Sequence, residues 1–262
     1  MLITAALILI VTTKVVLGQD DRLGIKRQRY LLNMEKDSVD EQYDGCTMKM
    51  EILVKTKYLS EEIHADISGF GKVWENSKKK ITGPKGILKR DHLIAISVYT
   101  GGIVYRKFNE DVRTGKQKYK DKTFKWFSLH FWLTRAIQTL NETQQGCKLT
   151  FHGTNVTFDG VKNTEIRFGS FVSTSRTSKV AMKFGSESCF EIITCEGADV
   201  SKYSPLPNEK EVLIPPYEKF KVTDIKKGDW CKTVFVLKST GIKSNLNCAG
   251  KPKKYHNVII SD

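Results

Sequence analysis

The first half of the chain carries apolar residues at intervals of three and four, the spacing of one buried helix face. The pattern is clearest over 126–140, at Trp126, Leu129, Leu133, Ala136 and Leu140. Weaker patterns of the same kind predict helices over 48–63 and 70–81, and a third apolar cluster spans 88–99. The polar and charged stretch 19–45 is predicted to be a loose lead-in.

After Gly146 the pattern changes to short runs rich in β-branched and aromatic residues, which predict strands. One short helix interrupts them over 177–184, where Thr177 can cap the helix and Gly185 can end it. Helices followed by strands favour an α+β fold over a parallel α/β sheet. The predicted strands are 147–151, 166–174, 189–194, 211–214, 220–222 and 233–237.

We interpret the two patterns as one domain, 46–248, with a helical part over 46–145 and a β-rich part over 146–248, followed by a tail over 249–262. The apolar run 1–18 is typical of a signal peptide. A short membrane anchor is the alternative, although the run before its first lysine is too short to span a bilayer. Because the tail has no hydrophobic stretch, we expect a secreted, extracellular protein without a lipid anchor.

The 262 residues carry a formal net charge of +14. The basic residues are dispersed, apart from local clusters such as Lys78-Lys79-Lys80. A solvated surface accounts for this charge, and attraction to acidic cell surfaces, an anionic polysaccharide or an anionic dinucleotide also fits it. No nucleic-acid motif accompanies the charge and no G-x-G-x-x-G precedes a helix, so we expect neither a nucleic-acid partner nor a Rossmann site.

Six cysteines accompany the predicted export. Their even number and the lack of a C-x-x-C pair favour disulfide bonds over a metal site, so we expect no metal. Six cysteines allow fifteen pairings, among which the spacing alone does not choose. Two Asn-x-Thr sequons, at Asn141 and Asn155, are candidate glycosylation sites.

Two carboxylates stand close together in the β-rich half. Glu211 begins the predicted strand 211–214, which Pro215 and Pro216 end. If Glu209 extends this strand, both carboxylates point to one face, which suits acid–base chemistry or the stabilisation of a cation. The alternative is a solvated Glu-Lys-Glu turn.

Three segments of the β-rich half together resemble the arginine-specific ecto-ADP-ribosyltransferases. That family has, in order, an Arg-Gly strand, a Phe-x-Ser-x-Ser strand, and Glu-x-Glu before a Val-Leu-Ile-Pro-Pro segment. The resemblance runs from about Cys46 to Cys248 and implies an ADP-ribosyltransferase fold, a helical part followed by a mostly antiparallel two-sheet NAD-binding core. The segments are Leu149-Thr-Phe-His-Gly-Thr154, Ile166-Arg-Phe-Gly-Ser-Phe-Val-Ser-Thr-Ser175 and Glu209-Lys-Glu-Val-Leu-Ile-Pro-Pro216.

The resemblance implies an enzyme that moves ADP-ribose from NAD or NADP to arginine residues of target proteins and releases nicotinamide, with NAD hydrolysis as a related outcome. Glu211 would be the catalytic glutamate, and Glu209 would orient and deprotonate the acceptor guanidinium. Ser173 matches the serine that bonds the nicotinamide ribose and holds the glutamate. Ser175 shares its face in a regular strand.

His152 falls where the family has its arginine. In the poly(ADP-ribose) polymerase branch, a histidine at the matching place bonds an adenosine ribose hydroxyl, so His152 is a candidate catalytic-site and NAD contact. Gly153 would let the ligand approach the backbone. Tyr99 falls where the family has a tyrosine near the dinucleotide, or is an ordinary core residue at a helix end. The altered arginine leaves a second interpretation open, a family member of reduced or no activity that acts as a binding protein.

The resemblance further implies two disulfide bonds and leaves two cysteines for a third. The implied pairs are Cys46–Cys248 and Cys147–Cys195, and Cys189 and Cys231 remain. A Phe-Asn-x-x-Val-Arg segment, Phe108 to Arg113, matches the helical part of the family domain and carries no chemistry by itself. His130, on the flank of the helix over 126–140, is interpreted as structural.

Overall fold

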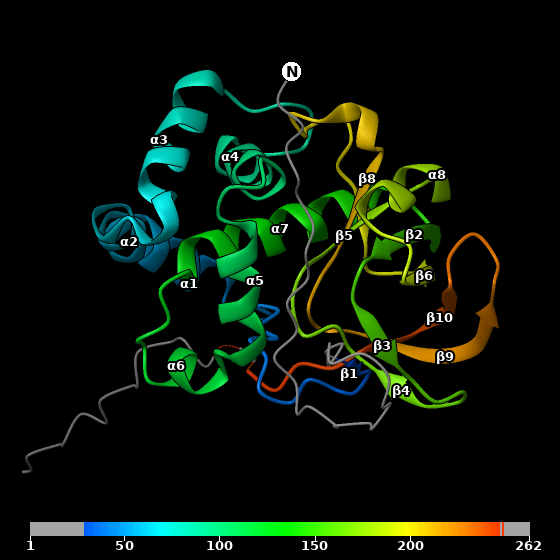
Figure 1. Ribbon diagram of the computed structural model, residues 1–262. Coiled ribbons are helices and arrows are strands. Elements are labelled where there is room, and N and C mark those ends of the chain that lie inside the picture. Colours follow the sequence, from blue (N-terminus) through cyan, green and yellow to red (C-terminus); the bar gives the residue numbers. More distant parts are fainter. Residues whose placement is uncertain (1–28, 247, 249–262) are drawn as a thin grey trace, which may run out of the picture.

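Figure 1 shows the computed structural model, in which residues 29–246 and 248 are described. Helices α1 to α7 lie to one side of the large sheet, and α8 lies beside its strands. A π-helical stretch, Val54–Tyr58, joins α1 to α2, so one helical rod covers the range predicted as 48–63. The helices of this part are α1 (Thr47–Leu53), α2 (Leu59–Ala65), α3 (Phe70–Lys80), α4 (Arg90–Thr100), α5 (Tyr105–Thr114), α6 (Lys116–Lys120) and α7 (Phe127–Thr143).

The strands form an eight-stranded sheet in the order β4-β9-β10-β6-β2-β5-β8-β7, and a separate parallel pair, β1 with β3. Within the large sheet only β10 and β6 run parallel, so the predicted α+β, mostly antiparallel fold is confirmed. The strands are β1 (Arg29–Leu31), β2 (Lys148–Thr154), β3 (Thr157–Asp159), β4 (Glu165–Ile166), β5 (Val172–Ser175), β6 (Ser188–Thr194), β7 (Ala198–Asp199), β8 (Glu211–Ile214), β9 (Glu218–Lys227) and β10 (Thr233–Ile242).

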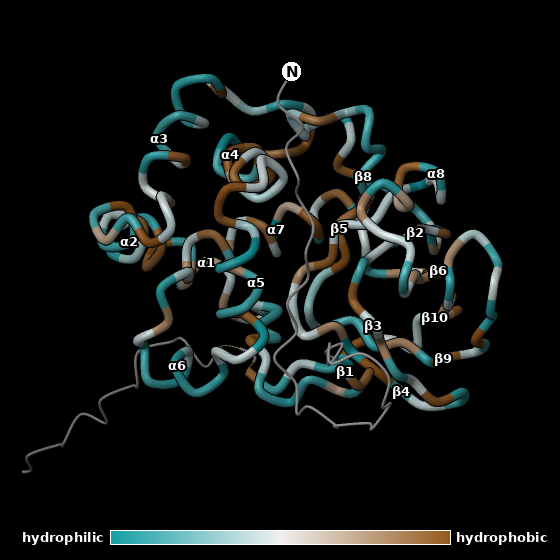
Figure 2. Tube along the Cα trace, in the orientation of Figure 1, coloured by the Kyte–Doolittle hydropathy of each residue, from teal (hydrophilic) through white to brown (hydrophobic). Residues whose placement is uncertain are grey.

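The helical part packs around α7, whose apolar stripe is fully buried. Figure 2 shows hydrophobic residues on α4 and α7, whereas α6 is hydrophilic. His130 lies in this core, with Nδ1 2.7 Å from the Tyr43 hydroxyl and Nε2 3.0 Å from the Val39 carbonyl. Because a carbonyl only accepts, Nε2–H donates to Val39 and Nδ1 accepts from Tyr43. The structural role expected for His130 is confirmed.

The prediction of a loose lead-in is wrong for residues 29–45. Val39 and Tyr43 are fully buried, and β1 pairs with β3. Asp40 is buried as well, because its carboxylate lies 2.6 Å from the guanidinium of Arg167 and both side chains are almost fully enclosed. A buried charge is tolerated when it is paired and hydrogen-bonded, so a polar sequence can still be part of a core.

Arg167 also explains why the strand predicted over 166–174 is broken. Its guanidinium donates to three backbone carbonyls besides Asp40, which draws the backbone after β4 out of the sheet until β5 begins at Val172. The short helix is α8 (Ser178–Ala181), extended by a 3-10 turn, Met182–Phe184. Thr177 occupies its N-cap position without a side-chain capping bond.

Three disulfide bonds hold the ends and edges of the fold. Two are the pairs implied by the resemblance, and the third joins the remaining cysteines at the ends of β6 and the β9–β10 hairpin. They are Cys46–Cys248, Cys147–Cys195 and Cys189–Cys231. Within the described ranges, no helix combines the length and the hydrophobicity that crossing a bilayer requires. The predicted signal peptide, 1–18, and the tail, 249–262, lie outside the described residues.

Asn141 has a structural role that conflicts with a glycan. Its Nδ2 donates to the carbonyls of Cys195 at 2.9 Å and Gly197 at 3.0 Å. Both hydrogens of the amide are engaged, and an N-linked sugar attaches at that nitrogen. Of the two candidate sites, Asn155 is therefore the one we expect to carry a glycan, because it is exposed in the turn between β2 and β3.

Candidate active site

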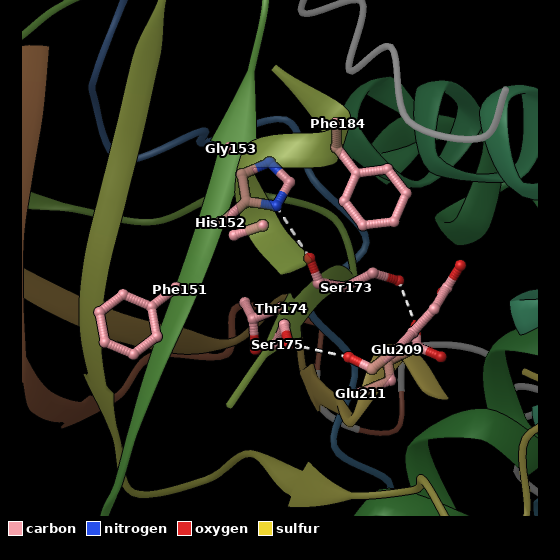
Figure 3. Close-up of a pocket in the computed structure, with 10 residues that line it drawn as sticks. Phe151, His152, Gly153, Ser173, Thr174, Ser175, Phe184, Glu209 and Glu211 are labelled. Carbon is pink, nitrogen blue, oxygen red and sulfur yellow. Dashed lines mark hydrogen bonds between the residues drawn. The ribbon is translucent and has the colours of Figure 1, made fainter. Parts of the chain in front are cut away.

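Three neighbouring strands, β2, β5 and β8, bring five of the predicted site residues to one pocket: His152, Gly153, Ser173, Ser175 and Glu211. Figure 3 shows their side chains around a narrow cleft of about 260 Å³ that is partly open to solvent. β5 and β8 run antiparallel, with Ser173 opposite Leu213 and Ser175 opposite Glu211. The residues that line the cleft are Phe151, His152, Gly153, Ser173, Thr174, Ser175, Ala181, Phe184, Glu209 and Glu211.

Ser173 and Glu211 form a hydrogen-bonded pair in the cleft. The Ser173 hydroxyl donates to Oε1 of Glu211 at 2.5 Å, while the buried Oε2 has no hydrogen-bond partner among the described residues. Glu211 is only 3% exposed, and this burial raises its pKa to about 8. The bond from Ser173 opposes that rise, and the nearby charge of Glu209 adds to it. The free protein therefore holds a carboxyl group that an adjacent cation would readily ionise.

Glu209 reaches the cleft from a turn and not from the strand. It ends a 3-10 turn, Pro207–Glu209, and Lys210 follows with a φ of 49°, in the left-handed region. Glu209 therefore does not extend the strand, and the left-handed conformation of Lys210 breaks the alternation of side chains between Glu209 and Glu211. Both carboxylates nevertheless line the same cleft (Figure 3). Glu209 is half-buried, which raises its pKa, and the charge of Lys183 partly offsets this.

Ser175 holds this turn in place. Its hydroxyl donates to the backbone carbonyl of Glu209 at 2.8 Å and accepts from the amide of Thr177 at 3.2 Å. Arg176 adds a backbone bond, from its amide to the carbonyl of Lys210 at 3.1 Å. Ser175 therefore faces the cleft as predicted, but its hydroxyl is occupied by the protein backbone.

His152 is a buried, neutral acceptor. Its Nδ1 lies 2.8 Å from the carbonyl of Ser173, so Nδ1 carries the hydrogen and Nε2 holds a free lone pair. Nε2 is buried, and no residue within the described ranges forms a hydrogen bond with it. Burial lowers the pKa of His152 to about 4, and the bond to Ser173 opposes that change. A hydroxyl group entering the cleft can donate to Nε2.

The lack of a side chain at Gly153 serves packing within the protein. A Cβ on this residue would lie 2.3 Å from the carbonyl oxygen of Ala181 and 2.5 Å from that of Gly185. β2 therefore approaches α8 and its 3-10 turn too closely for any other residue. Gly153 borders the cleft, but the contacts that require glycine are with the protein itself.

Tyr99 lies outside the residues that line the cleft. Its side chain is fully buried, and its hydroxyl donates to the carbonyl of Phe171 at 3.1 Å. Of the two interpretations of Tyr99, the structure shows the core residue. The sequence reasoning did not find Phe184, which closes one side of the cleft at the end of the 3-10 turn (Figure 3). Its only sequence signal is its place at the end of the predicted short helix.

Comparisons with known proteins agree with this geometry. The model of the family described as NAD:arginine ADP-ribosyltransferase matches residues 32–245. The erythroblast NAD(P)(+)–arginine ADP-ribosyltransferase of Gallus gallus is 35% identical over 228 residues, which cover 83% of this chain and 75% of that protein. Ecto-ADP-ribosyltransferase 5 of Bos taurus is 35% identical over 237 residues, covering 83% and 73%.

Solved structures give the same result. The eucaryotic mono-ADP-ribosyltransferase ART2.2 superposes with a TM-score of 0.71 at 31% identity, covering 84% of this chain and 98% of that one. A mutant of ART2.2 in complex with NAD superposes with a TM-score of 0.68 at 30% identity, with the same coverage.

Proposed function

The chain belongs to the NAD:arginine ADP-ribosyltransferase family, and we propose that it transfers ADP-ribose from NAD to arginine side chains of proteins and releases nicotinamide. The observation that carries this proposal is the buried Ser173–Glu211 pair, in which one carboxylate oxygen has no partner in the part of the chain that the structure describes. Relatives that carry this activity in their names span most of the chain.

The chemistry requires a carboxylate beside the reacting ribose. The bond between the ribose C1′ and the nicotinamide nitrogen breaks, and nicotinamide leaves with the electron pair, so the sugar develops the charge of an oxocarbenium ion. Glu211 is the group that stabilises this charge. Its raised pKa fits the role, because the cationic nicotinamide ribose favours the ionised form as it binds. Ser173 orients the carboxylate through Oε1.

The acceptor step uses Glu209. An arginine nitrogen forms the new bond to C1′, and Glu209 takes the proton that the guanidinium loses. An arginine is protonated at neutral pH, so it needs a positioned base in order to attack. Glu209 is half-buried at the open side of the cleft, where an acceptor protein could reach it. Water can replace arginine as the acceptor, which gives NAD hydrolysis.

His152 supplies the contact to the rest of NAD. Its unpartnered Nε2 accepts a hydrogen bond and has no charge to offer, so it suits a ribose hydroxyl and not a phosphate. NAD is then held by a neutral contact where the family arginine would supply a charged one. We propose no metal in this reaction, because no step requires one.

Several of the relatives are named ecto-ADP-ribosyltransferases, and one, from Oryctolagus cuniculus, is named as GPI-linked. We propose that this protein is exported and released, with a glycan on Asn155. Expression in animal cells tests the proposal: protein in the medium supports it, and protein recovered only with the membranes contradicts it.

The enzymatic proposal is tested with labelled NAD and polyarginine. We expect the wild-type protein to label polyarginine and to release nicotinamide. Glu211→Gln keeps the size of the side chain and removes its charge, and we expect it to abolish both reactions. Equal inertness of wild type and Glu211→Gln, with no NAD binding by either, would instead indicate a binding protein.

A further inference from the structure

Side chains of the helical part donate hydrogen bonds to backbone carbonyls in the segment that leads into β5. Between Ile166 and Val172 the chain belongs to no strand and is buried, so its carbonyl groups need partners from elsewhere. Arg113 Nη2 donates to the Ser170 hydroxyl at 2.7 Å, and its Nε lies 3.4 Å from the carbonyl of Phe168. This contact joins α5 to the strand that carries the catalytic serine.

The backbone carbonyl of Phe171 accepts two hydrogen bonds from side chains of the helical part. It accepts from the Tyr99 hydroxyl at 3.1 Å and from Asn109 Nδ2 at 3.0 Å. Asn109 Nδ2 also donates to the Tyr99 hydroxyl at 3.1 Å, so the three groups form a closed triangle. Tyr99 comes from the last turn of α4 and Asn109 from α5, and both are buried. Two helices therefore converge on one carbonyl.

The position of that carbonyl matters because Phe171 lies two residues before Ser173. β5 pairs with β2 in register only at Ser175, so the start of β5 has few sheet contacts on that side. Its other supports are the bond from His152 Nδ1–H to the carbonyl of Ser173 and the antiparallel ladder with β8, which carries Glu211. A displacement of Phe171 would therefore move the Ser173 hydroxyl relative to Glu211.

We propose that Asn109 and Tyr99 are positioning residues for the reaction: they hold the start of β5, and through it the Ser173–Glu211 pair. The proposal rests on the proposed function and assigns a role to the Phe-Asn segment beyond marking the helical part. Neither residue lines the cleft. Their effect passes through Ser173, both by way of the Phe171 carbonyl and through a side-chain interaction of the Tyr99 hydroxyl with Ser173 itself. Optimal catalysis depends on the placement of reacting groups to within about 1 Å, so loosening this anchor lowers turnover.

Two variants test the proposal. Tyr99→Phe removes one hydroxyl and keeps the ring contacts with Tyr105, Phe108 and Phe171. Asn109→Leu removes both donors and keeps the size of the side chain. We expect each to lower kcat by between about tenfold and a hundredfold. In each, the pH above which kcat/KM becomes constant should rise, because the bond from Ser173 favours the ionised form of Glu211.

Asp111→Ala is the matched control. Asp111 lies on the same helix and accepts a hydrogen bond from Trp126 Nε1 at 2.8 Å, so the variant also loses a partly buried bond of α5. It does not touch the segment before β5, and we expect its pH profile to be that of wild type. A double-mutant comparison completes the test, because Asn109→Leu should have little further effect on kcat when Ser173 is already alanine.

The outcomes separate the two proposals. If the pH profile stays at the wild-type position in Tyr99→Phe and Asn109→Leu, or if Asn109→Leu is equally harmful in the Ser173→Ala background, the positioning role is wrong. Should Ser173→Ala leave too little turnover to measure, the pH profiles of the single variants decide. An inert wild-type protein would overturn the proposed function and this inference together.

Discussion

Glu211 makes the stability of this fold depend on pH, and the dependence can be isolated. Burial raises the pKa of Glu211 from 4.5 to about 8. Between these values the folded protein keeps a proton that the unfolded chain releases. The contribution of Glu211 to stability is therefore fully present below pH 4.5 and is lost as the pH rises to about 8. The decline is at most ~1.4 kcal/mol per pH unit, or roughly 4 kcal/mol over the window.

The perturbation is Glu211→Gln, which does not titrate. Its amide brings a constant penalty, because the nitrogen at the position of Oε2 would have no protein partner. That penalty does not depend on pH, so only the change with pH in the free-energy difference between variant and wild type is interpreted. Glu62, with a pKa of about 8, and Glu35, with one of about 7, titrate in the same range in both proteins, so they cancel in the difference.

The assay is urea unfolding from pH 5 to pH 9, followed by tryptophan fluorescence with the disulfide bonds intact. We expect Glu211→Gln to gain stability relative to wild type by roughly 2–4 kcal/mol between pH 5 and pH 8. The same measurement on Glu209→Gln should show a much smaller change, because Glu209 is only half-buried. A difference for Glu211→Gln that does not vary with pH would refute the assignment of the buried, protonated carboxyl group.

Three further predictions concern activity and modification. For wild type, kcat/KM should rise with pH and become constant above about pH 8. Ser173→Ala should raise the pH at which kcat/KM becomes constant, and an unchanged pH would show that Ser173 does not favour the ionised form of Glu211. Glu209→Gln should lower transfer to polyarginine by about a hundredfold or more and leave measurable NAD hydrolysis, and equal loss of both would contradict its role as the acceptor base. The protein expressed in animal cells should carry one N-linked glycan, removed by Asn155→Gln and retained by Asn141→Gln; mass spectrometry that finds sugar on Asn141 would contradict the structural role of its amide.

The sequence predicted the fold class and the long helix because both depend on repeated patterns. The stripe over 126–140 is the buried face of α7, and the change of pattern after Gly146 separates helices from strands. The same reasoning failed for residues 29–45, where the buried side chains include Asp40 and the pattern is polar. Hydrophobic periodicity does not report a charge that is buried with a partner more than a hundred residues away, here Arg167.

Most residues of the candidate site could be predicted from the sequence, but their geometry could not. Spacing in a strand placed Glu209 and Glu211 on one face, but a left-handed residue between them brings Glu209 in from a turn. The resemblance suggested a ligand-contact reason for Gly153, whereas its lack of a side chain is required by backbone atoms distant in sequence. The sequence did not decide whether Tyr99 contacts the dinucleotide or lies in the core, because a single residue at a helix end does not show which way its side chain faces.

The residue that departs from the family pattern also holds the site together. β2 and β5 pair in register only at Phe151 and Ser175, and the bond from His152 Nδ1–H to the carbonyl of Ser173 adds a second link between them. The imidazole packs 6.0 Å from the ring of Phe190 and is kept neutral by burial. A guanidinium would keep its charge, and burying that charge in this apolar setting would be costly, so it would turn toward the cleft and release the carbonyl of Ser173. An exchange of His152 for arginine therefore changes NAD binding and the position of Ser173 together, and its effect on NAD affinity is separable from its effect on turnover only when both are measured.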